Sequence, residues 1–183
     1  MKNLALIMLT SCLFALALSC RKLNPYNPNP APVLPPISAE GRNTFGFMFG
    51  NEVWAPNFYS ASAILYASYS SMNGGPRLSI VCLRKSTRNA KGVDDFTLQY
   101  FSSSIGLGTY PLNSSTCKAM AYILLPDNKE REYQLEDVGT ITFSRWDIVN
   151  KIVSGTFSMT LKDALSGEKV TVTQGRFDVK FSE

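Results

Sequence analysis

Apolar and polar residues alternate along the last third of the chain. Between residues 153 and 162, every odd-numbered position is apolar or small and every even-numbered position is polar. A period of two is typical of a half-buried strand, because successive side chains point to opposite faces. Similar alternation covers residues 140–144 and 170–181, with connections expected at residues 147–150 and 163–167. The pattern predicts a three-stranded antiparallel meander.

The last strand of this meander changes its inward positions partway along. Val170 and Val172 fall on even numbers, whereas the apolar positions of residues 177–181 are odd. One extra residue must therefore be absorbed near residues 174–175. Gly175 can occupy a bulge at low cost because it lacks a Cβ atom. The sequence thus predicts a bulged last strand.

Shorter alternating segments precede the meander. Residues 44–54 suggest a hairpin that turns at Gly50-Asn51, and residues 64–69 and 77–83 suggest a second pair of strands. Further strands are expected at residues 96–101, 117–125 and 131–135. Short strands separated by Gly, Pro and Asn predict an all-β fold. We expect an antiparallel β-sandwich or a partly open barrel of about eight to ten short strands, closed by the C-terminal meander.

The first twenty residues have the pattern of an export signal. A single Lys2 precedes an apolar run that ends at Leu18, and Ser19-Cys20 follows. This ending is typical of a bacterial lipoprotein signal, in which Cys20 receives acyl chains such as palmitate and becomes the mature N-terminus. We expect anchoring in the outer membrane, facing the periplasm. An uncleaved anchor or a secreted protein are the alternatives, although the run is short for a span of about 20 residues.

A proline-rich segment follows Cys20. Residues 21–38 contain six of the ten prolines of the chain, which favours an extended, semi-rigid spacer. At about 3.1 Å per residue, this tether could hold the domain up to roughly 60 Å from the lipid. The predicted organisation is therefore a signal peptide at residues 1–19, a lipidated cysteine and tether at residues 20–40, and one all-β domain at residues 41–183.

Three blocks of sequence resemble a known family. They are residues 43–56 (NTFGFMFGNEVWAP), residues 141–161 (ITFSRWDIVNKIVSGTFSMTL) and residues 172–181 (VTQGRFDVKF). Together they resemble small Bacteroidetes-type lipoproteins that are classed only as a domain of unknown function. The matching positions are Gly46, Gly50, Trp54, Asp147, Asn150, Ser154, Gly155, Thr156, Phe157, Gly175, Arg176, Phe177 and Asp178. The resemblance implies an anchored all-β module and brings no catalytic residue with it.

Composition narrows the classes of function. The chain contains no histidine, which excludes Ser-His-Asp and Cys-His catalytic groups and any His-ligated zinc site. The formal net charge of +4 is too small to indicate a nucleic-acid partner. Asp127, Asn128 and Glu130 have the ligand chemistry of a calcium site but no recognisable loop pattern. We expect neither a metal nor a cofactor.

Adjacent acidic residues raise the alternative of an Asp/Glu-dependent glycan hydrolase. The pairs are Asp94-Asp95 and Glu136-Asp137. Such an enzyme needs two carboxyl groups about 5–9 Å apart across a cleft, whereas neighbours on a strand point to opposite faces. Solvated charges at turns are the expected interpretation. The basic residues Arg84, Lys85, Arg88 and Lys91 are likewise expected at a solvated hairpin tip, with contact to phosphate-bearing lipid or an acidic glycan as the alternative.

Two cysteines lie in predicted strands. Cys82 and Cys117 would meet an oxidising compartment after export, where a disulfide forms if the Cα atoms come within about 7 Å. Two buried free thiols are the equal alternative.

Aromatic residues supply the candidate ligand contacts. Trp54 and Trp146 are candidates for stacking against a ligand, and Trp146 is expected on the outward side of its strand. The alternative is that the aromatic rings fill the core. The leading hypothesis is a non-enzymatic binding or structural module that meets a partner protein or a glycan at the envelope.

Overall fold

The computed structural model describes residues 31–56, 64–72, 75–89 and 92–183. The predicted signal peptide, Cys20 and Lys91 lie outside these residues. The described residues belong to one compact unit, Ala31–Glu183. None of them forms part of a helix long and apolar enough to cross a membrane.

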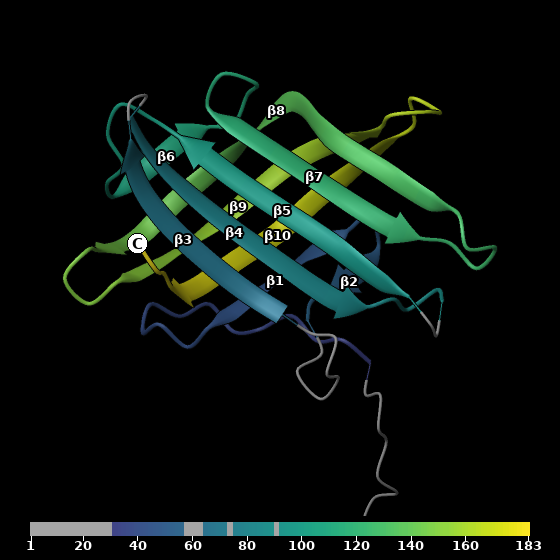
Figure 1. Cartoon of the computed structure of the whole chain (residues 1–183), viewed down its shortest axis with the longest axis horizontal. Coiled ribbons are helices and arrows are strands. Elements are labelled where there is room, and N and C mark those ends of the chain that lie inside the picture. The colour runs from purple at the N-terminus through teal and green to yellow at the C-terminus, as the bar shows by residue number, and fades with distance from the viewer. Residues whose placement is uncertain (1–30, 57–63, 73–74, 90–91) are drawn as a thin grey trace, which may run out of the picture. The chain divides into compact units, whose positions relative to one another are not determined.

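Ten β-strands make up the described part of the chain, and all their pairings are antiparallel. They form a single sheet in the order β2-β1-β10-β9-β8-β7-β5-β4-β3, with β6 paired to β8 (Figure 1). The strands are β1 (Thr44–Phe49), β2 (Glu52–Trp54), β3 (Ile64–Met72), β4 (Gly75–Lys85), β5 (Val93–Phe101), β6 (Gly108–Pro111), β7 (Cys117–Leu124), β8 (Glu130–Asp147), β9 (Ile152–Asp163) and β10 (Lys169–Lys180).

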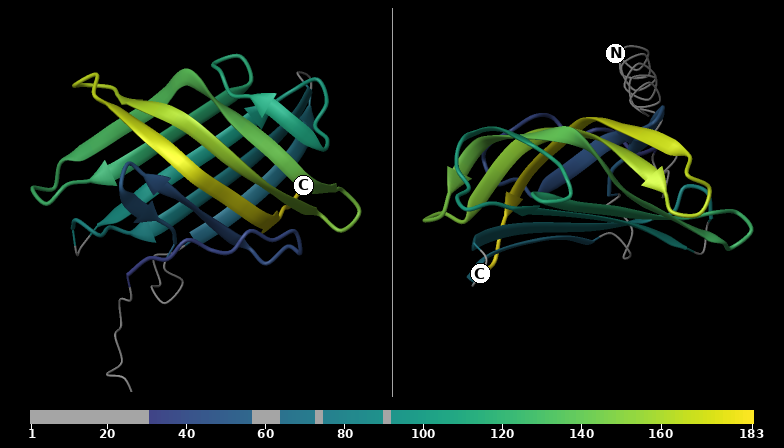
Figure 2. Two further views of the ribbon diagram at one scale, coloured as in Figure 1. Left: turned by 180° about the vertical axis from the view of Figure 1, so that it is seen from behind. Right: turned by 90° about the horizontal axis from the view of Figure 1, so that it is seen from above.

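The sheet curls over itself into a partly open barrel. Strands β3, β4, β5 and β7 form one layer, and β9, β10 and β1 cross behind them with most of β8 (Figures 1 and 2). The long strand β8 pairs with β7 at its start and with β9 along most of its length, so it carries the sheet from one layer to the other. The predicted all-β fold class is confirmed.

The predicted meander corresponds to β8, β9 and β10. Its last strand is bulged, because the register with β9 shifts between Val172 and Gly175. The left-handed backbone conformation falls on Gln174, with φ of 52°, rather than on the glycine. Gly175 is needed for close approach instead, since a Cβ atom there would lie 2.5 Å from the carbonyl oxygen of Phe157. The bulge is confirmed, and its two residues have different roles.

One predicted strand boundary was wrong, and one strand was not predicted. Residues 131–135 are not a separate strand but the beginning of β8, whose register with β9 shifts between Leu135 and Gly139. This irregularity interrupts the alternation of apolar residues and hides the continuity of the strand. The short strand β6 was not predicted, because none of its four residues is buried and the apolar pattern is therefore absent.

Aromatic side chains fill the interior between the two layers. Phe47 stacks on Trp54 at 5.0 Å between ring centroids, and Phe96 lies 4.5 Å from Phe47. Phe45 and Phe157 extend this cluster, with their centroids 5.6 Å apart. All five side chains are almost completely buried. Aromatic pairs of this kind contribute about 0.5–1.5 kcal/mol each beyond the burial of apolar area. The cluster therefore adds to the stability of the barrel.

Hydrogen bonds from other parts of the chain occupy backbone groups at the two free edges of the sheet. At edge strand β3, Ser182 accepts the amide of Tyr69 at 2.8 Å and donates its own amide to Ala67 at 3.0 Å. At edge strand β2, Nη1 of Arg84 donates to the carbonyl oxygen of Val53 at 3.0 Å. Backbone groups that would otherwise template pairing with another chain are therefore partly occupied.

Candidate binding surface

The chain ahead of β1 lies across the outside of the meander. We call residues 35–43 the strap. Arg176 of β10 donates to the carbonyl oxygen of Pro35 at 3.1 Å, and Arg145 of β8 donates to that of Ala39 at 2.6 Å. At the end of the strap, Asn43 Oδ1 accepts the amide of Lys180 at 2.8 Å. The predicted boundary between tether and domain at residue 40 is therefore too late, since the chain is bound to the sheet from Pro35 onwards.

A buried carboxylate holds the middle of the strap. Asp178 accepts hydrogen bonds from the Ser154 hydroxyl at 2.6 Å and from the Gly41 amide at 2.7 Å. The amides of Glu40 and Arg42 donate to it at 3.1 Å each, and the hydroxyl of Ser38 completes the set. Burial alone would raise the pKa of Asp178, but these hydrogen bonds outweigh it and hold the pKa well below its usual range. The carboxylate is thus a structural acceptor, ionised whenever the protein is folded at ordinary pH.

The outer side of the meander next to the strap carries an ordered set of hydroxyl groups. Thr109 of β6 pairs with Thr142 of β8, Thr142 with Thr156 of β9, and Thr156 with Arg176 of β10. A second row places Thr140 opposite Ser158. The hydroxyl face, as we call it, comprises Thr109, Thr140, Thr142, Thr156, Ser158, Thr160, Thr171 and Thr173, all on the side of the sheet away from the core.

The local sequence explains this arrangement. Threonine is β-branched and packs well on a pleated sheet, while its hydroxyl group offers one donor and two acceptor positions. Two cross-strand hydrogen bonds link hydroxyl groups directly, from Thr109 to Thr142 at 2.8 Å and from Thr140 to Ser158 at 3.3 Å. The remaining donor and acceptor positions of these hydroxyl groups face outward, so they are available to a polar, uncharged ligand.

A hollow of about 340 Å³ lies between the strap and the hydroxyl face. Ile37 of the strap forms its apolar wall and is 67% exposed. Arg176 closes one side, where its Nε donates to the Gln174 carbonyl oxygen and its Nη1 to the strap. The lining residues are Ile37, Thr140, Thr142, Thr156, Phe157, Ser158, Gln174, Gly175 and Arg176. The hollow thus combines a hydroxyl-lined floor with one aliphatic wall.

Trp54 cannot stack against a ligand. Its side chain is 0% exposed, with Phe47 on one face at 5.0 Å and the guanidinium carbon of Arg84 4.9 Å from its ring centroid. The prediction of a ligand-stacking role for Trp54 is wrong, because the residue belongs to the core of the barrel.

Trp146 lies on the inner side of its strand rather than the expected outer side. The register of β8 with β9 shifts between Phe143 and Arg145, so Arg145 lies opposite Ser154 on the outside and Trp146 lies opposite Val153 on the inside. Its ring stacks on Phe181 at 6.0 Å. One extra residue, Ser144, thus reverses the orientation expected from simple alternation. Trp146 remains partly exposed but contributes to the end of the core.

Cys82 and Cys117 are free, buried thiols. They lie on β4 and β7, with β5 between them, and the residue of β7 in register with Cys82 is Ala121, four residues from Cys117. Two strand spacings alone amount to about 10 Å, which exceeds the Cα separation that a disulfide allows. Burial raises the pKa of Cys117 to about 12 and that of Cys82 further still. Of the two alternatives for this pair, the structure shows the free thiols.

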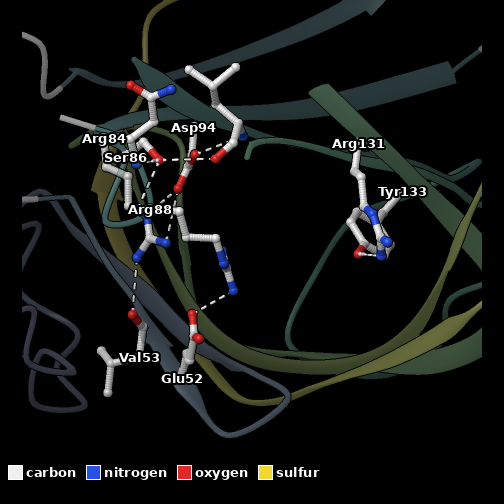
Figure 3. A network of polar contacts seen from close by, with 10 residues as sticks. Glu52, Val53, Arg84, Ser86, Arg88, Asp94, Arg131 and Tyr133 are labelled. Atoms are coloured by element: carbon white, nitrogen blue, oxygen red, sulfur yellow. Dashed lines mark hydrogen bonds and ion pairs between the residues drawn. The ribbon is translucent and has the colours of Figure 1, made fainter. Parts of the chain in front are cut away.

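Asp94 and Arg84 form a buried ion pair instead of the predicted solvated charges. Nε and Nη2 of Arg84 both lie 3.1 Å from Asp94 Oδ2, and the side chains are 3% and 0% exposed (Figure 3). The second oxygen of Asp94 accepts the amide of Leu124 at 3.1 Å. Farther out, Arg88 pairs with Glu52 at 2.6 Å. These contacts fasten the β1–β2 hairpin to the opposite layer, which is a structural role.

In the other acidic pair, Glu136 lies beside two lysines. Lys169 and Lys162 lie 2.9 and 3.7 Å from the carboxylate oxygens of Glu136, and the hydrogen bond from Lys169 lowers its pKa. Asp95 has a pKa raised by burial, but it lies on the convex outer side of β5, opposite Leu83 and Tyr122. No group of three or more acidic or cysteine side chains with the arrangement of a metal site occurs among the described residues.

Comparisons with protein-family models, curated proteins and solved structures found no match to this chain. Five of the residues that carry the family resemblance in the sequence nevertheless have clear structural roles. Trp54 and Phe177 lie in the core, Arg176 and Asp178 hold the strap, and Asp147 caps the β8–β9 turn by accepting the amide of Asn150 at 2.9 Å. These five positions therefore contribute to the folded structure.

Proposed function

We propose that this protein is a lipid-anchored, non-enzymatic binding module of the bacterial envelope, in which Cys20 carries the lipid and the hydroxyl face meets a partner protein or a glycan. The observation that carries the proposal is the row from Thr109 through Thr142 and Thr156 to Arg176, which presents side chains in register across four strands beside a hollow.

The state of the acidic residues favours binding over hydrolysis. A glycan hydrolase uses a carboxylic acid of raised pKa and a second carboxylate across a cleft. Asp94 and Asp178 are buried and saturated with hydrogen bonds, and the hollow beside the hydroxyl face is lined by no carboxylate. The hollow beside the hydroxyl face therefore lacks the pair of carboxyl groups that a glycan hydrolase needs.

The lipid anchor is supported by the apolar run that ends at Ser19-Cys20 and by the proline-rich chain that follows. If residues 21–34, which precede the strap, are as extended as their prolines favour, they would span about 43 Å at about 3.1 Å per residue. The resemblance to small Bacteroidetes-type lipoproteins supports the same proposal. No acidic cluster follows Cys20, which favours an outer-membrane location facing the periplasm.

Site-specific photo-crosslinking in living cells tests the binding function. A photoreactive amino acid at Thr140, on the hydroxyl face, is expected to capture an envelope component, whereas one at Gln99, on the outer side of β5, is not. Equal capture at both positions, or none at Thr140, would contradict the proposal. Incorporation of labelled palmitate into the native protein, compared with Cys20→Ala, tests the anchor separately.

A further inference from the structure

We propose that the hollow between Ile37 and the hydroxyl face binds one sugar ring of an uncharged glycan, and that neighbouring sugars lie along the threonine rows. This inference rests on the proposed binding function and names the class of ligand. Its basis is the chemistry of the lining side chains and the way the strap is fixed above them.

The polar groups of the site complement hydroxyl groups. Each threonine hydroxyl both donates and accepts, as does each sugar hydroxyl, so the two sets can pair in many arrangements. Thr142 and Thr156 face each other across β8 and β9, and Thr140 faces Ser158 in the next row. Neighbouring positions within a row lie about 4.8 Å apart, and the two rows lie about 6.8 Å apart along the strands, which suits repeated contacts along a chain of sugars.

The one ionised side chain at the site is already hydrogen-bonded within the protein. Arg176 is the one ionised side chain that lines the hollow, and it donates to the carbonyl oxygens of Pro35 and Gln174 and, at 3.3 Å, to the side-chain oxygen of Gln174. Its guanidinium group therefore positions the strap. The lining provides no second cation for an anionic ligand, whereas its hydroxyl groups suit an uncharged one.

Ile37 is held where a sugar ring would pack. The strap is clamped on both sides of it, at the carbonyl oxygen of Pro35 by Arg176 and at that of Ala39 by Arg145. The Ile37 side chain is nevertheless 67% exposed. One apolar wall beside convergent polar groups is the usual composition of a small-molecule site. The C–H face of a pyranose ring matches such a wall.

The size of the hollow agrees with a single ring. Its volume of about 340 Å³ is at the lower end of the range of about 300–1,000 Å³ for small-ligand sites. A protein partner is a weaker fit, because the centre of a protein interface is enriched in aromatic residues, Met and Arg. Of these residue types, the hollow is lined only by Arg176 and by the buried Phe157.

The test is titration of the mature lipidated protein in a sugar-free detergent, monitored by calorimetry. The probes are cellohexaose, maltohexaose and chitohexaose, which are uncharged, and hexagalacturonate, which is anionic. We expect at least one uncharged probe to bind and hexagalacturonate to bind at least tenfold more weakly. The double variant Thr142→Val/Thr156→Val keeps the shape of both side chains and should weaken binding about tenfold or more, since each hydroxyl forms a hydrogen bond of moderate strength.

The matched control is Thr97→Val on the outer side of β5, which should leave the affinity unchanged. Binding of hexagalacturonate alone, equal binding by the double variant, or no binding of any uncharged probe would overturn the assignment of the ligand. Crosslinking at Thr140 separates this failure from failure of the proposed function. Capture of a polypeptide at Thr140 would support the binding function and contradict the assignment of a glycan ligand. No capture would contradict both proposals.

Discussion

Ser154 donates its hydroxyl proton to Asp178 at 2.6 Å, and both side chains are buried although they lie on the side of the sheet away from the core. The strap explains this burial, because it covers them and supplies the amides of Gly41 and Arg42 to the same carboxylate. A polar pair on the outer face thus acts as the anchor for the chain that leads into the barrel.

Replacement of Asp178 by asparagine should release the strap. An amide offers one acceptor oxygen in place of two and carries no charge, so several of the five donors would lose their partner. We expect a loss of about 2–3 kcal/mol in the free energy of unfolding. Hydrogen exchange at the Gly41 and Arg42 amides should accelerate more than exchange in β4. Ser154→Ala is the milder companion variant, and unchanged strap exchange in Asp178→Asn would contradict the anchor role.

The buried pair of Arg84 and Asp94 should tolerate joint replacement better than single replacement. Arg84→Met or Asp94→Leu alone leaves an uncompensated charge in the core, which costs about 3–5 kcal/mol. The double variant removes both charges, and its loss of stability should be well below the sum of the two single losses. Urea denaturation of the four proteins measures this coupling. Strict additivity would show that the pair is not an interacting unit.

The stability of the fold should decrease at acidic pH, because carboxylates that are ionised in the folded protein become protonated. Hydrogen bonds from Arg145 and Asn150 lower the pKa of Asp147 from 3.8 to about 2, and that of Asp178 is lowered as well. A depressed pKa stabilises the folded state above the unfolded pKa, and this contribution is lost as the pH falls through the folded pKa. We therefore expect constant stability above about pH 5 and a decline between about pH 4 and pH 2. Asp147→Asn should flatten that decline, whereas a decline of unchanged size would contradict the assignment.

The two internal cysteines should stay reduced and unreactive in the folded protein. Burial raises both thiol pKa values, so little thiolate is present at pH 8 and reagents have no access to it. Iodoacetamide should modify Cys82 and Cys117 only after denaturation, and mass spectrometry without reductant should detect no bond between them. A native disulfide would show that the register across β4, β5 and β7 is wrong.

Most of the fold could be predicted from alternation. The hairpin of residues 44–54, the pair of β3 and β4, and the bulged meander were all visible because apolar side chains mark the inner face of each strand. The continuity of β8 was not visible. Its irregularities at residues 136–138 and at Ser144 shift the alternation, and only the first has a glycine beside it, Gly139.

The candidate site was harder to predict. Sequence reasoning assigned binding to Trp54 and Trp146, whereas the structure places Trp54 in the core and turns Trp146 inward. The hydroxyl face left a signal, since the polar positions at residues 154–160 are all Ser or Thr. The strap left none, because its contacts with Asp178 and Arg176 join residues about 140 positions apart in the chain. Such pairings depend on tertiary structure alone.

Because Arg176 and Asp178 lie on β10, between β1 and β9, any pull on the chain ahead of Pro35 is delivered to an internal strand and not to an edge. An edge strand can be peeled away one hydrogen bond at a time, whereas β10 is bonded on both sides along most of its length. The point of attachment therefore equips the barrel to bear mechanical load without unzipping.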